Sequence, residues 1–130
     1  MMEYGRYRMD MKETIKDRKA CGILVKALGH PSLVLMAKSA GMDFLFYDCE
    51  HGTLSYEQLH DLMVLGNASG IPSVVRAPQL SRKDVSKILD YGASGVMVPM
   101  IESEEDARKL VSWSKYPPVG KRSYTGGANT

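Results

Sequence analysis

Polar residues that could do acid–base chemistry follow apolar stretches of the sequence. Lys26 follows the first stretch, Asp48, Glu50 and His51 end the second, and Arg76 ends the third. An imidazole is the commonest general base near neutral pH, and a carboxylate three residues upstream could orient it. A guanidinium at the end of an apolar strand needs an anionic partner, such as a carboxylate, a phosphate or an enolate. We therefore predict that His51 is a base oriented by Asp48, and that Arg76 holds an anionic group.

Each of these residues also has a purely structural interpretation. His51 could bond a backbone carbonyl at a strand end, and Arg76 could pair with Glu50. Lys26 could form a Schiff base with a carbonyl substrate, although a strand-end lysine that extends to solvent is the more usual finding. Glu50 and Glu102 are possible metal ligands or bases, and they suit a helix start or an ion pair equally well.

The apolar stretches have the length of strands, and they alternate with segments of helical periodicity. We expect strands over residues 21–28, 43–49, 73–77 and 95–101, with helices that begin at Pro31 and after the capping residues Ser55, Ser81 and Ser103. Strands of near-continuous apolar residues, each followed by a helix, predict an α/β fold with a parallel sheet. Loops at the carboxyl ends of parallel strands converge, so the polar residues above are expected to meet there.

Two architectures fit this pattern, a doubly wound open sheet and a (β/α)8 TIM barrel. The first strand is followed by no glycine-rich nucleotide-binding motif, which favours the barrel. A complete barrel takes about 250 residues, whereas this chain has four βα units in 130 residues. We therefore expect the first four βα units of a barrel in residues 21–130, preceded by an N-terminal helix or extension in residues 1–20.

The composition excludes several classes of partner. The formal net charge of +2 is too small to indicate nucleic-acid binding. No apolar run approaches the roughly 18 to 20 residues of a membrane span, and the N-terminal stretch lacks the apolar core of a secretory signal. We expect no membrane association and a cytoplasmic location. Cys21 and Cys49 are too few and too far apart for a disulfide scaffold, so both are expected to be reduced, buried thiols.

The sequence resembles a known family of enzymes. The resemblance is carried, in order, by residues 41–52, 74–76, 89–93, 98–100 and 115–122, which include Asp-x-Glu-His and Tyr-Pro-Pro-x-Gly-x-Arg motifs. These resemble the HpcH/HpaI aldolases, which are metal-dependent (class II) pyruvate aldolases on a (β/α)8 barrel. The resemblance extends from about Cys21 onward and matches the N-terminal half of the family barrel.

The resemblance implies a role for several residues. It implies that His51 is the catalytic base, acting directly or through a water, with Asp48 as its orienting partner. Arg76 matches the arginine that contacts the keto oxygen of bound pyruvate and stabilises its enolate. Asp90 matches an aspartate that reaches the active site of a neighbouring subunit in hexameric members, and Arg122 matches a loop-ordering arginine. The implied protein is a homo-oligomer, a hexamer or a trimer, that acts on a small 2-oxo acid.

The resemblance also implies a divalent metal, Mg²⁺, Mn²⁺ or Co²⁺, in the complete barrel. The family holds this ion with a glutamate at the end of strand five and an aspartate near the end of strand six. Because the sequence stops at Thr130, before strand five, we expect no metal ligand in this chain and place both ligands beyond Thr130.

The implied reaction is the reversible aldol cleavage of a 4-hydroxy-2-oxo acid to pyruvate and an aldehyde through a metal-stabilised enolate. We expect little activity from the 130-residue chain alone, because half a barrel leaves two unpaired sheet edges and an uncovered apolar face. Two alternatives stay open: a non-catalytic half-barrel that serves assembly or binding, and a related lyase that cleaves citryl or malyl thioesters.

Overall fold

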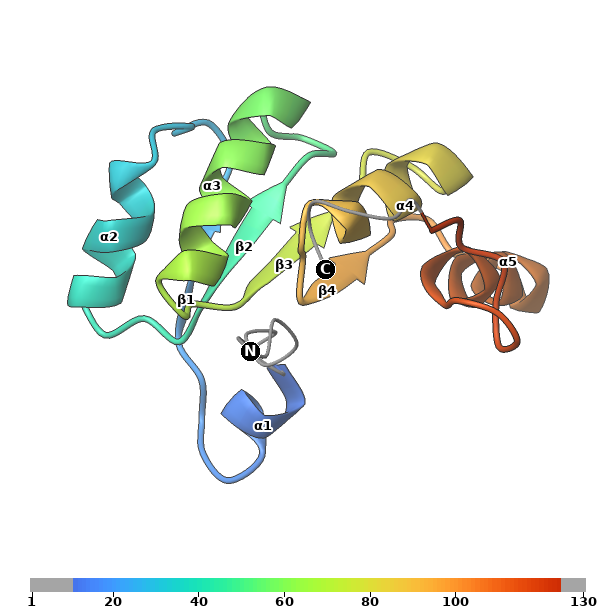
Figure 1. Cartoon of the computed structure of the whole chain (residues 1–130), viewed down its shortest axis with the longest axis horizontal. Coiled ribbons are helices and arrows are strands. Elements are labelled where there is room, and N and C mark those ends of the chain that lie inside the picture. Colours follow the sequence, from blue (N-terminus) through green and yellow to red (C-terminus); the bar gives the residue numbers. More distant parts are fainter. Residues whose placement is uncertain (1–10, 125–130) are drawn as a thin grey trace, which may run out of the picture.

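The computed structural model describes residues 11–124. Residues 1–10 of the predicted N-terminal extension and residues 125–130 of the predicted half-barrel lie outside the described residues. Within the described part, the predicted N-terminal helix is short, α1 (Met11–Ile15). It stands apart from the sheet at the lower edge of the view (Figure 1).

Four parallel strands form one sheet whose order is the order of the sequence. The strands are β1 (Gly22–Val25), β2 (Phe44–Asp48), β3 (Ser73–Arg76) and β4 (Gly95–Met97). In a doubly wound sheet the chain reverses direction and the first strand lies inside the sheet. Here each new strand adds on the same side, as it does in the wall of a barrel, so the (β/α)8 pattern predicted from the sequence is the one observed.

A helix follows each strand: α2 (Ser32–Ser39), α3 (Tyr56–Ala68), α4 (Arg82–Asp90) and α5 (Glu104–Ser114). The predicted capping residues begin the last three of these helices. Ser55 accepts from the backbone of Gln58 and the Gln58 side chain accepts from the backbone of Ser55, which is a complete capping box. Ser81 and Ser103 cap α4 and α5 through their hydroxyls, which accept from the backbone N–H groups of Asp84 and Asp106. Local sequence therefore determines where these helices start.

The two faces of the sheet have different surroundings. Side chains alternate along a strand, and the face that includes Val25, Leu45, Tyr47 and Val75 is buried beneath the helices. Figure 1 shows α3 lying across the front of the sheet, with α2 beside it and α4 over the other end. The opposite face is open, and Leu24 is 54% exposed there. We call the second face the open face; in a closed barrel it would line the interior.

Two predicted strands are longer than those observed. The first leaves the sheet after Val25 rather than at residue 28, and the fourth ends at Met97 rather than at residue 101. Pro99 has no N–H to donate to a neighbouring strand, and Met100 has a positive φ of 57° that turns the chain out of the extended conformation. Lys26 and Pro99 stand just past these ends in the sequence, but apolar residues continue beyond each of them, and the predicted strands were therefore too long.

Helix α5 buries little apolar surface. The apolar residues Ala107 and Val111 are exposed, while Leu110 and Trp113 are half-buried against the core. The helix packs beside α4 at the end of the row (Figure 1). It therefore buries one narrow stripe instead of a full face.

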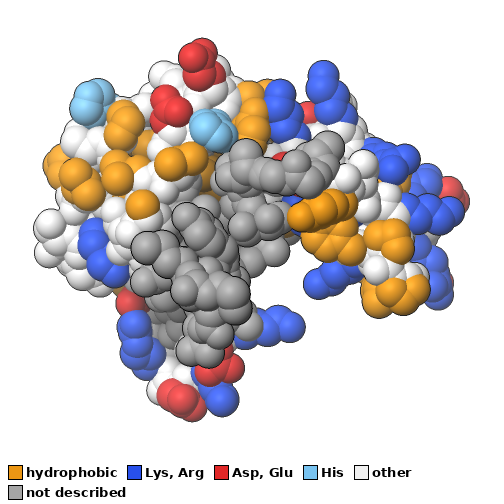
Figure 2. Space-filling model, in the orientation of Figure 1, with side chains coloured by type: hydrophobic (Ala, Val, Ile, Leu, Met, Phe, Trp, Pro, Cys, Tyr) orange, Lys and Arg blue, Asp and Glu red, His pale blue; other side chains and the backbone are white. Residues whose placement is uncertain are grey.

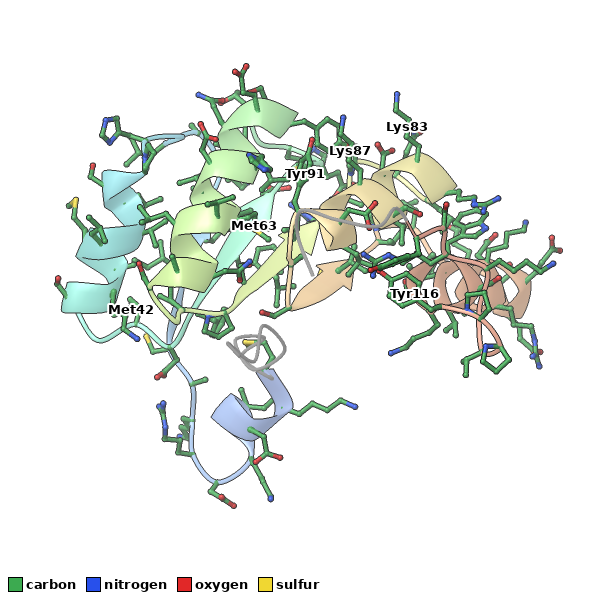
Figure 3. The ribbon with its side chains drawn as sticks, in the orientation of Figure 1. Met42, Met63, Lys83, Lys87, Tyr91 and Tyr116 are labelled. Carbon is green, nitrogen blue, oxygen red and sulfur yellow. The ribbon has the colours of Figure 1, made fainter. Side chains whose placement is uncertain are left out.

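Helices α3 and α4 are joined by a polar and aromatic contact. The Lys87 ammonium lies 4.7 Å from the ring centroid of Tyr56 and 5.8 Å from that of Tyr91, within the range of cation–π attraction. Lys87 and Tyr91 lie close together along α4 (Figure 3). Lysine at this place stabilises the packing of two helices, so it is not a free surface charge.

Within residues 11–124, no helix has both the length and the apolar composition needed to cross a bilayer.

Candidate functional site

The site is built around one fully buried carboxylate at the end of β2. Asp48 has no exposed surface, and its partner across the ladder is Arg76 at the end of β3. Arg76 donates from Nε to Oδ1 at 3.0 Å and from Nη2 to Oδ2 at 2.7 Å. This bidentate contact holds the pKa of Asp48 far below its ordinary value. Asp48 is therefore an anion at any pH at which the protein would work, and it fixes the plane of the guanidinium.

The same carboxylate also shapes the loop after β2. Asp48 Oδ1 accepts hydrogen bonds from the backbone N–H of Glu50 at 3.0 Å and of His51 at 3.1 Å. Gly52 follows, and a Cβ at that position would meet the carbonyl oxygen of Asp48 at 1.9 Å and that of Lys26 at 2.6 Å. Only glycine permits this close approach. The turn consequently presents the side chains of Glu50 and His51 at the carboxyl end of the sheet.

Glu50 joins the two groups that the sequence analysis singled out. Its Oε2 lies 3.1 Å from Nη1 of Arg76, and its Oε1 lies 3.6 Å from Nε2 of His51. The predicted convergence of the imidazole and the guanidinium is thus observed, with one carboxylate between them. Arg76 is 25% exposed and His51 is 67% exposed, so a ligand can reach both side chains from the solvent.

Asp48 was predicted to orient the His51 ring, but the structure shows it bonded to the His51 backbone instead. Asp48 binds the backbone of His51 and the Arg76 side chain, whereas the carboxylate nearest the ring is that of Glu50. The alternative pairing of Arg76 with Glu50 is also observed, in addition to the pair with Asp48. Sequence spacing could not distinguish Asp48 from Glu50 as the ring's neighbour, because both carboxylates lie within three residues of His51.

Lys26 belongs to the same cluster. Its Nζ lies 3.8 Å from Oδ2 of Asp48, and the Lys26 side chain is 52% exposed. Its backbone carbonyl accepts a 2.7 Å hydrogen bond from the N–H of Thr53. The end of β1 is thereby tied to the loop that carries Glu50 and His51.

Asp90 and Arg122 lie elsewhere in the chain. Asp90 is the last residue of α4, which runs antiparallel to the strands, so it lies at the opposite end of the βα layer from Arg76. Nη2 of Arg122 donates to Asp90 Oδ1 at 2.5 Å, and the guanidinium stacks on the Tyr116 ring at 4.6 Å. Tyr116 lies in the turn beyond α5 (Figure 3). This chain therefore does not bring Asp90 to its own Arg76 and His51.

The carboxylates of the site do not form a metal centre by themselves. Asp48 is saturated by Arg76 and two amides, Glu50 faces Arg76 and His51, and Glu102 is exposed beyond β4. Within residues 11–124, no group of three or more His, Cys, Asp or Glu side chains is arranged to hold a metal ion. The described residues therefore do not provide a binding site for a divalent cation.

The two cysteines differ from the prediction that both are buried. Both are free thiols, but Cys21 is exposed while Cys49, next to Asp48, is half-buried. Burial, together with the charges of Asp48 and Asp84, raises the pKa of Cys49 to about 11. The Cys49 thiol therefore stays protonated near neutral pH and is not a nucleophile of the site.

One supporting contact was missed at the sequence level. The Tyr56 hydroxyl at the start of α3 donates to Asp84 Oδ1, and Ser81 Oγ donates to Asp84 Oδ2 at 2.6 Å. Burial raises the pKa of Asp84, but the bonds from Ser81 and Tyr56 outweigh it and the net shift is downward. The contact connects the beginnings of α3 and α4 behind the site. Asp84 had a visible signal, since it stands at the third position after a capping serine.

Comparison with known proteins places this arrangement in a family. The family model described as HpcH/HpaI aldolase/citrate lyase matches residues 23–129. A 4-hydroxy-4-methyl-2-oxoglutarate aldolase of Hapsidospora irregularis is 38% identical over 121 residues, which are 88% of this chain and 45% of that protein. A 4-hydroxy-2-oxovalerate aldolase of Novosphingobium aromaticivorans is 34% identical over 77% of this chain and 38% of its own length.

Solved structures agree with the sequence comparison. The HpcH/HpaI aldolase of Desulfitobacterium hafniense DCB-2 superposes with a TM-score of 0.84 and 32% identity, over 91% of this chain and 46% of that structure. The chain belongs to the HpcH/HpaI aldolase/citrate lyase family, as the motifs predicted. It spans about half the length of the relatives it matches, and its fold is that of four consecutive βα units of their barrel.

Proposed function

We propose that the protein to which this chain contributes is a carbon–carbon lyase. It cleaves a 4-hydroxy-2-oxo acid reversibly to pyruvate and an aldehyde or ketone. The observation that carries this proposal is the single carboxylate of Glu50 between the Arg76 guanidinium and the His51 imidazole. A cation and a base held a few ångströms apart are what aldol cleavage requires, since charge develops on one oxygen while a proton leaves another.

In the proposed reaction His51 takes the proton of the 4-hydroxyl group. The C3–C4 bond then breaks, the carbonyl compound leaves, and the electron pair forms the C2–C3 double bond of pyruvate enolate. Arg76 stabilises the negative charge on the C2 oxygen. Protonation of C3 by the imidazolium gives pyruvate and restores the base, so atoms and protons balance.

Arg76 has donors left for this task. A guanidinium carries five N–H groups; two of them donate to Asp48, and Nη1 forms an ion pair with Glu50. Because Arg76 is 25% exposed, a ligand can reach the donors that Asp48 does not use. Asp48 keeps the guanidinium in a fixed plane before substrate arrives, which reduces the reorganisation that the reaction needs.

The remaining family features are proposals for the assembled protein. A divalent metal would need carboxylates other than those described here, and it would supply additional polarisation of the 2-oxo acid. We propose that the protein is a cytoplasmic homo-oligomer in which Asp90 faces a neighbouring subunit. In this proposal Arg122 holds Asp90 in place through their ion pair and orders the turn after α5 by stacking on Tyr116.

The test is the release of pyruvate from 4-hydroxy-2-oxo acids, followed with a coupled dehydrogenase. His51→Ala is expected to lower kcat by about 10² to 10⁴. His30→Ala, which changes an exposed histidine at the start of α2, serves as the matched control and should keep full turnover. Near-normal turnover of His51→Ala would remove the assigned base and with it the proposal.

One observation favours a second candidate, a non-catalytic assembly subunit. Leu24 is 54% and Met97 is 48% exposed on the open face, and β1 and β4 are the edges of the described sheet. Such a surface requires a partner. Light scattering on the purified protein addresses this directly, and a monodisperse assembly that never releases pyruvate would favour the second candidate.

A further inference from the structure

Lys26 occupies a position in the site for which the proposed reaction has no use. Side chains alternate along β1, and Val25, which is paired with Tyr47, points toward the helices. Lys26 therefore emerges on the open face, in the row that continues with Asp48 on β2 and Arg76 on β3. A lysine amine thus lies at the carboxyl end of the sheet, beside the guanidinium that is proposed to contact a 2-oxo group.

The Lys26 amine is not held by its neighbour Asp48. Arg76 and two backbone amides already supply four hydrogen bonds to the Asp48 oxygens. The 3.8 Å between Lys26 Nζ and Asp48 Oδ2 is too long for a hydrogen bond, and 52% of the Lys26 side chain is exposed. Lys109, by contrast, lies 2.7 Å from Glu105 in an ion pair on α5. Lys26 can therefore approach a bound molecule without breaking a hydrogen bond to Asp48.

Arg76 and Lys26 can act on one small molecule at the same time. Both contact Oδ2 of Asp48, Arg76 from Nη2 at 2.7 Å and Lys26 from Nζ at 3.8 Å. If Arg76 donates to the oxygen of a 2-oxo group, the attached C2 atom lies within reach of the long Lys26 side chain. The same guanidinium polarises the carbonyl and makes C2 a better target for an amine.

The surroundings of Lys26 are those of a nucleophilic lysine. The next residues inward on the open face are Leu24, Phe46 and Val74, which are aligned across the same three strands. Lysines that form Schiff bases are activated by apolar surroundings or by a second cation nearby. The apolar row supplies the first condition, and Arg76 supplies the second.

Within residues 11–124, the side chains provide no site for a divalent cation. A lysine offers another way to draw electrons from C3, because a protonated imine nitrogen withdraws electrons through C2. We propose that Lys26 forms a Schiff base with pyruvate and related 2-oxo acids, and that this intermediate exchanges the C3 protons of pyruvate without a divalent metal. The inference rests on the proposed function at one point, the place of the 2-oxo oxygen at Arg76.

The step needs no oxidant or reductant. The neutral amine attacks C2, the bond between C2 and oxygen breaks, and the oxygen leaves as water with the two protons of the amine. The imine nitrogen then takes a proton. His51 removes a proton from C3, and the electron pair forms the C2–C3 double bond of an enamine. A solvent proton returns to C3, and addition of water at C2 releases pyruvate and the Lys26 amine.

Reduction of the Schiff base tests the proposal directly. The intact protein would be incubated with pyruvate, a chelator and cyanoborohydride, and the modified residues located by peptide mass mapping. Lys26 should gain the mass of pyruvic acid less one oxygen atom, at least about 10-fold faster than Lys16, because a positioned carbonyl reacts as though it were locally concentrated. No adduct on Lys26, or equal labelling of the two lysines, would overturn the proposal.

Lys16 is the matched control, because exposure alone does not make a lysine reactive. It is 62% exposed and lies 3.8 Å from Glu13, so its exposure and its distance from a carboxylate resemble those of Lys26. Lysine and arginine side chains also lie at several separate places on the surface (Figure 2). Adventitious labelling would reach such lysines as readily as Lys26, whereas a Schiff base of the site would not.

Deuterium exchange into pyruvate gives an independent readout. Proton NMR in deuterium oxide with a chelator would follow the loss of the pyruvate methyl signal. Lys26→Arg keeps the positive charge but cannot form an imine, so it should reduce the exchange to the rate of free pyruvate, whereas Lys16→Arg should keep the wild-type rate. Exchange that persists in Lys26→Arg, or that stops when the chelator is added, would overturn the proposal.

The outcome is separable from that of the proposed function. If Lys26 is trapped with pyruvate but no 4-hydroxy-2-oxo acid releases pyruvate, the Schiff base stands and the lyase activity fails. If pyruvate release depends on His51 while cyanoborohydride leaves Lys26 unmodified, the lyase stands and the Schiff base fails.

Discussion

Strand β2 has an Arg–Asp pair at each end, and the two pairs differ in what surrounds them. At the amino end, Arg18 donates to Asp43 at 2.8 and 2.5 Å, and the N–H of Cys21 donates to the same carboxylate at 2.8 Å. At the carboxyl end, Arg76 makes the corresponding contact with Asp48. The bidentate chemistry is the same at both ends.

The difference lies in the additional groups. Arg18 is 58% exposed, and its carboxylate partner connects residues 18–21 to the start of β2. Arg76 is mostly covered, and Asp48 also positions a loop with a second carboxylate and an imidazole. In barrels of this class the amino end of the strands stabilises and the carboxyl end holds the chemistry. The two ion pairs have the same chemistry, and they differ in the groups that each carboxylate holds in place. Asp48 belongs to the candidate site because it also positions the loop that carries Glu50 and His51.

The largest difference is expected in turnover. Arg76→Ala should lower kcat/KM for pyruvate release by about 10² to 10³, because it removes the proposed donor to the developing oxyanion. Arg18→Ala removes the equivalent donor at the other end of β2 and should leave kcat/KM unchanged. Steady-state kinetics on the two variants gives the comparison, and equal losses would show that both arginines act through folding alone.

A smaller difference is expected in stability. Asp48→Ala leaves the Arg76 guanidinium and two amides without their acceptor in a covered place, and it should cost about 2 kcal/mol of unfolding free energy. Asp43→Ala should cost less, since its partner Arg18 is 58% exposed and ion pairs open to solvent contribute little. Urea denaturation of both variants measures this, and a larger loss for Asp43→Ala would reverse the ranking of the two ends.

The smallest effect concerns acid pH. The bonds from Arg18 and Cys21 lower the pKa of Asp43 from 3.8 to about 2. A carboxylate with a lowered pKa stabilises the fold above its unfolded pKa, and this contribution is lost as the pH falls through the folded value. The melting temperature should therefore decrease between about pH 4 and pH 2, and it should decrease less in Asp43→Asn. Identical melting curves for wild type and Asp43→Asn over this range would contradict the assignment.

The contribution of Asp48 to stability should persist to lower pH, because the pKa of Asp48 is lowered further than that of Asp43.

Much of the fold was predictable because local signals agree with the tertiary structure. The capping serines at positions 55, 81 and 103 begin their helices where predicted. The alternation of strands and helices predicted the parallel sheet. The ends of β1 and β4 were predicted too far along the chain, because apolar residues continue past Lys26 and Pro99 although the sheet does not.

The candidate site was also predictable in part from the sequence. Sequence order predicted that His51 and Arg76 stand at the carboxyl ends of parallel strands, because loops of a βα repeat converge at that end, and the observed strand order makes those two strands neighbours. Only the tertiary structure decided which carboxylate each one meets. That choice depends on a turn over Gly52 and on hydrogen bonds across strands, and the balance of such contacts is set by three-dimensional packing rather than by spacing along the chain.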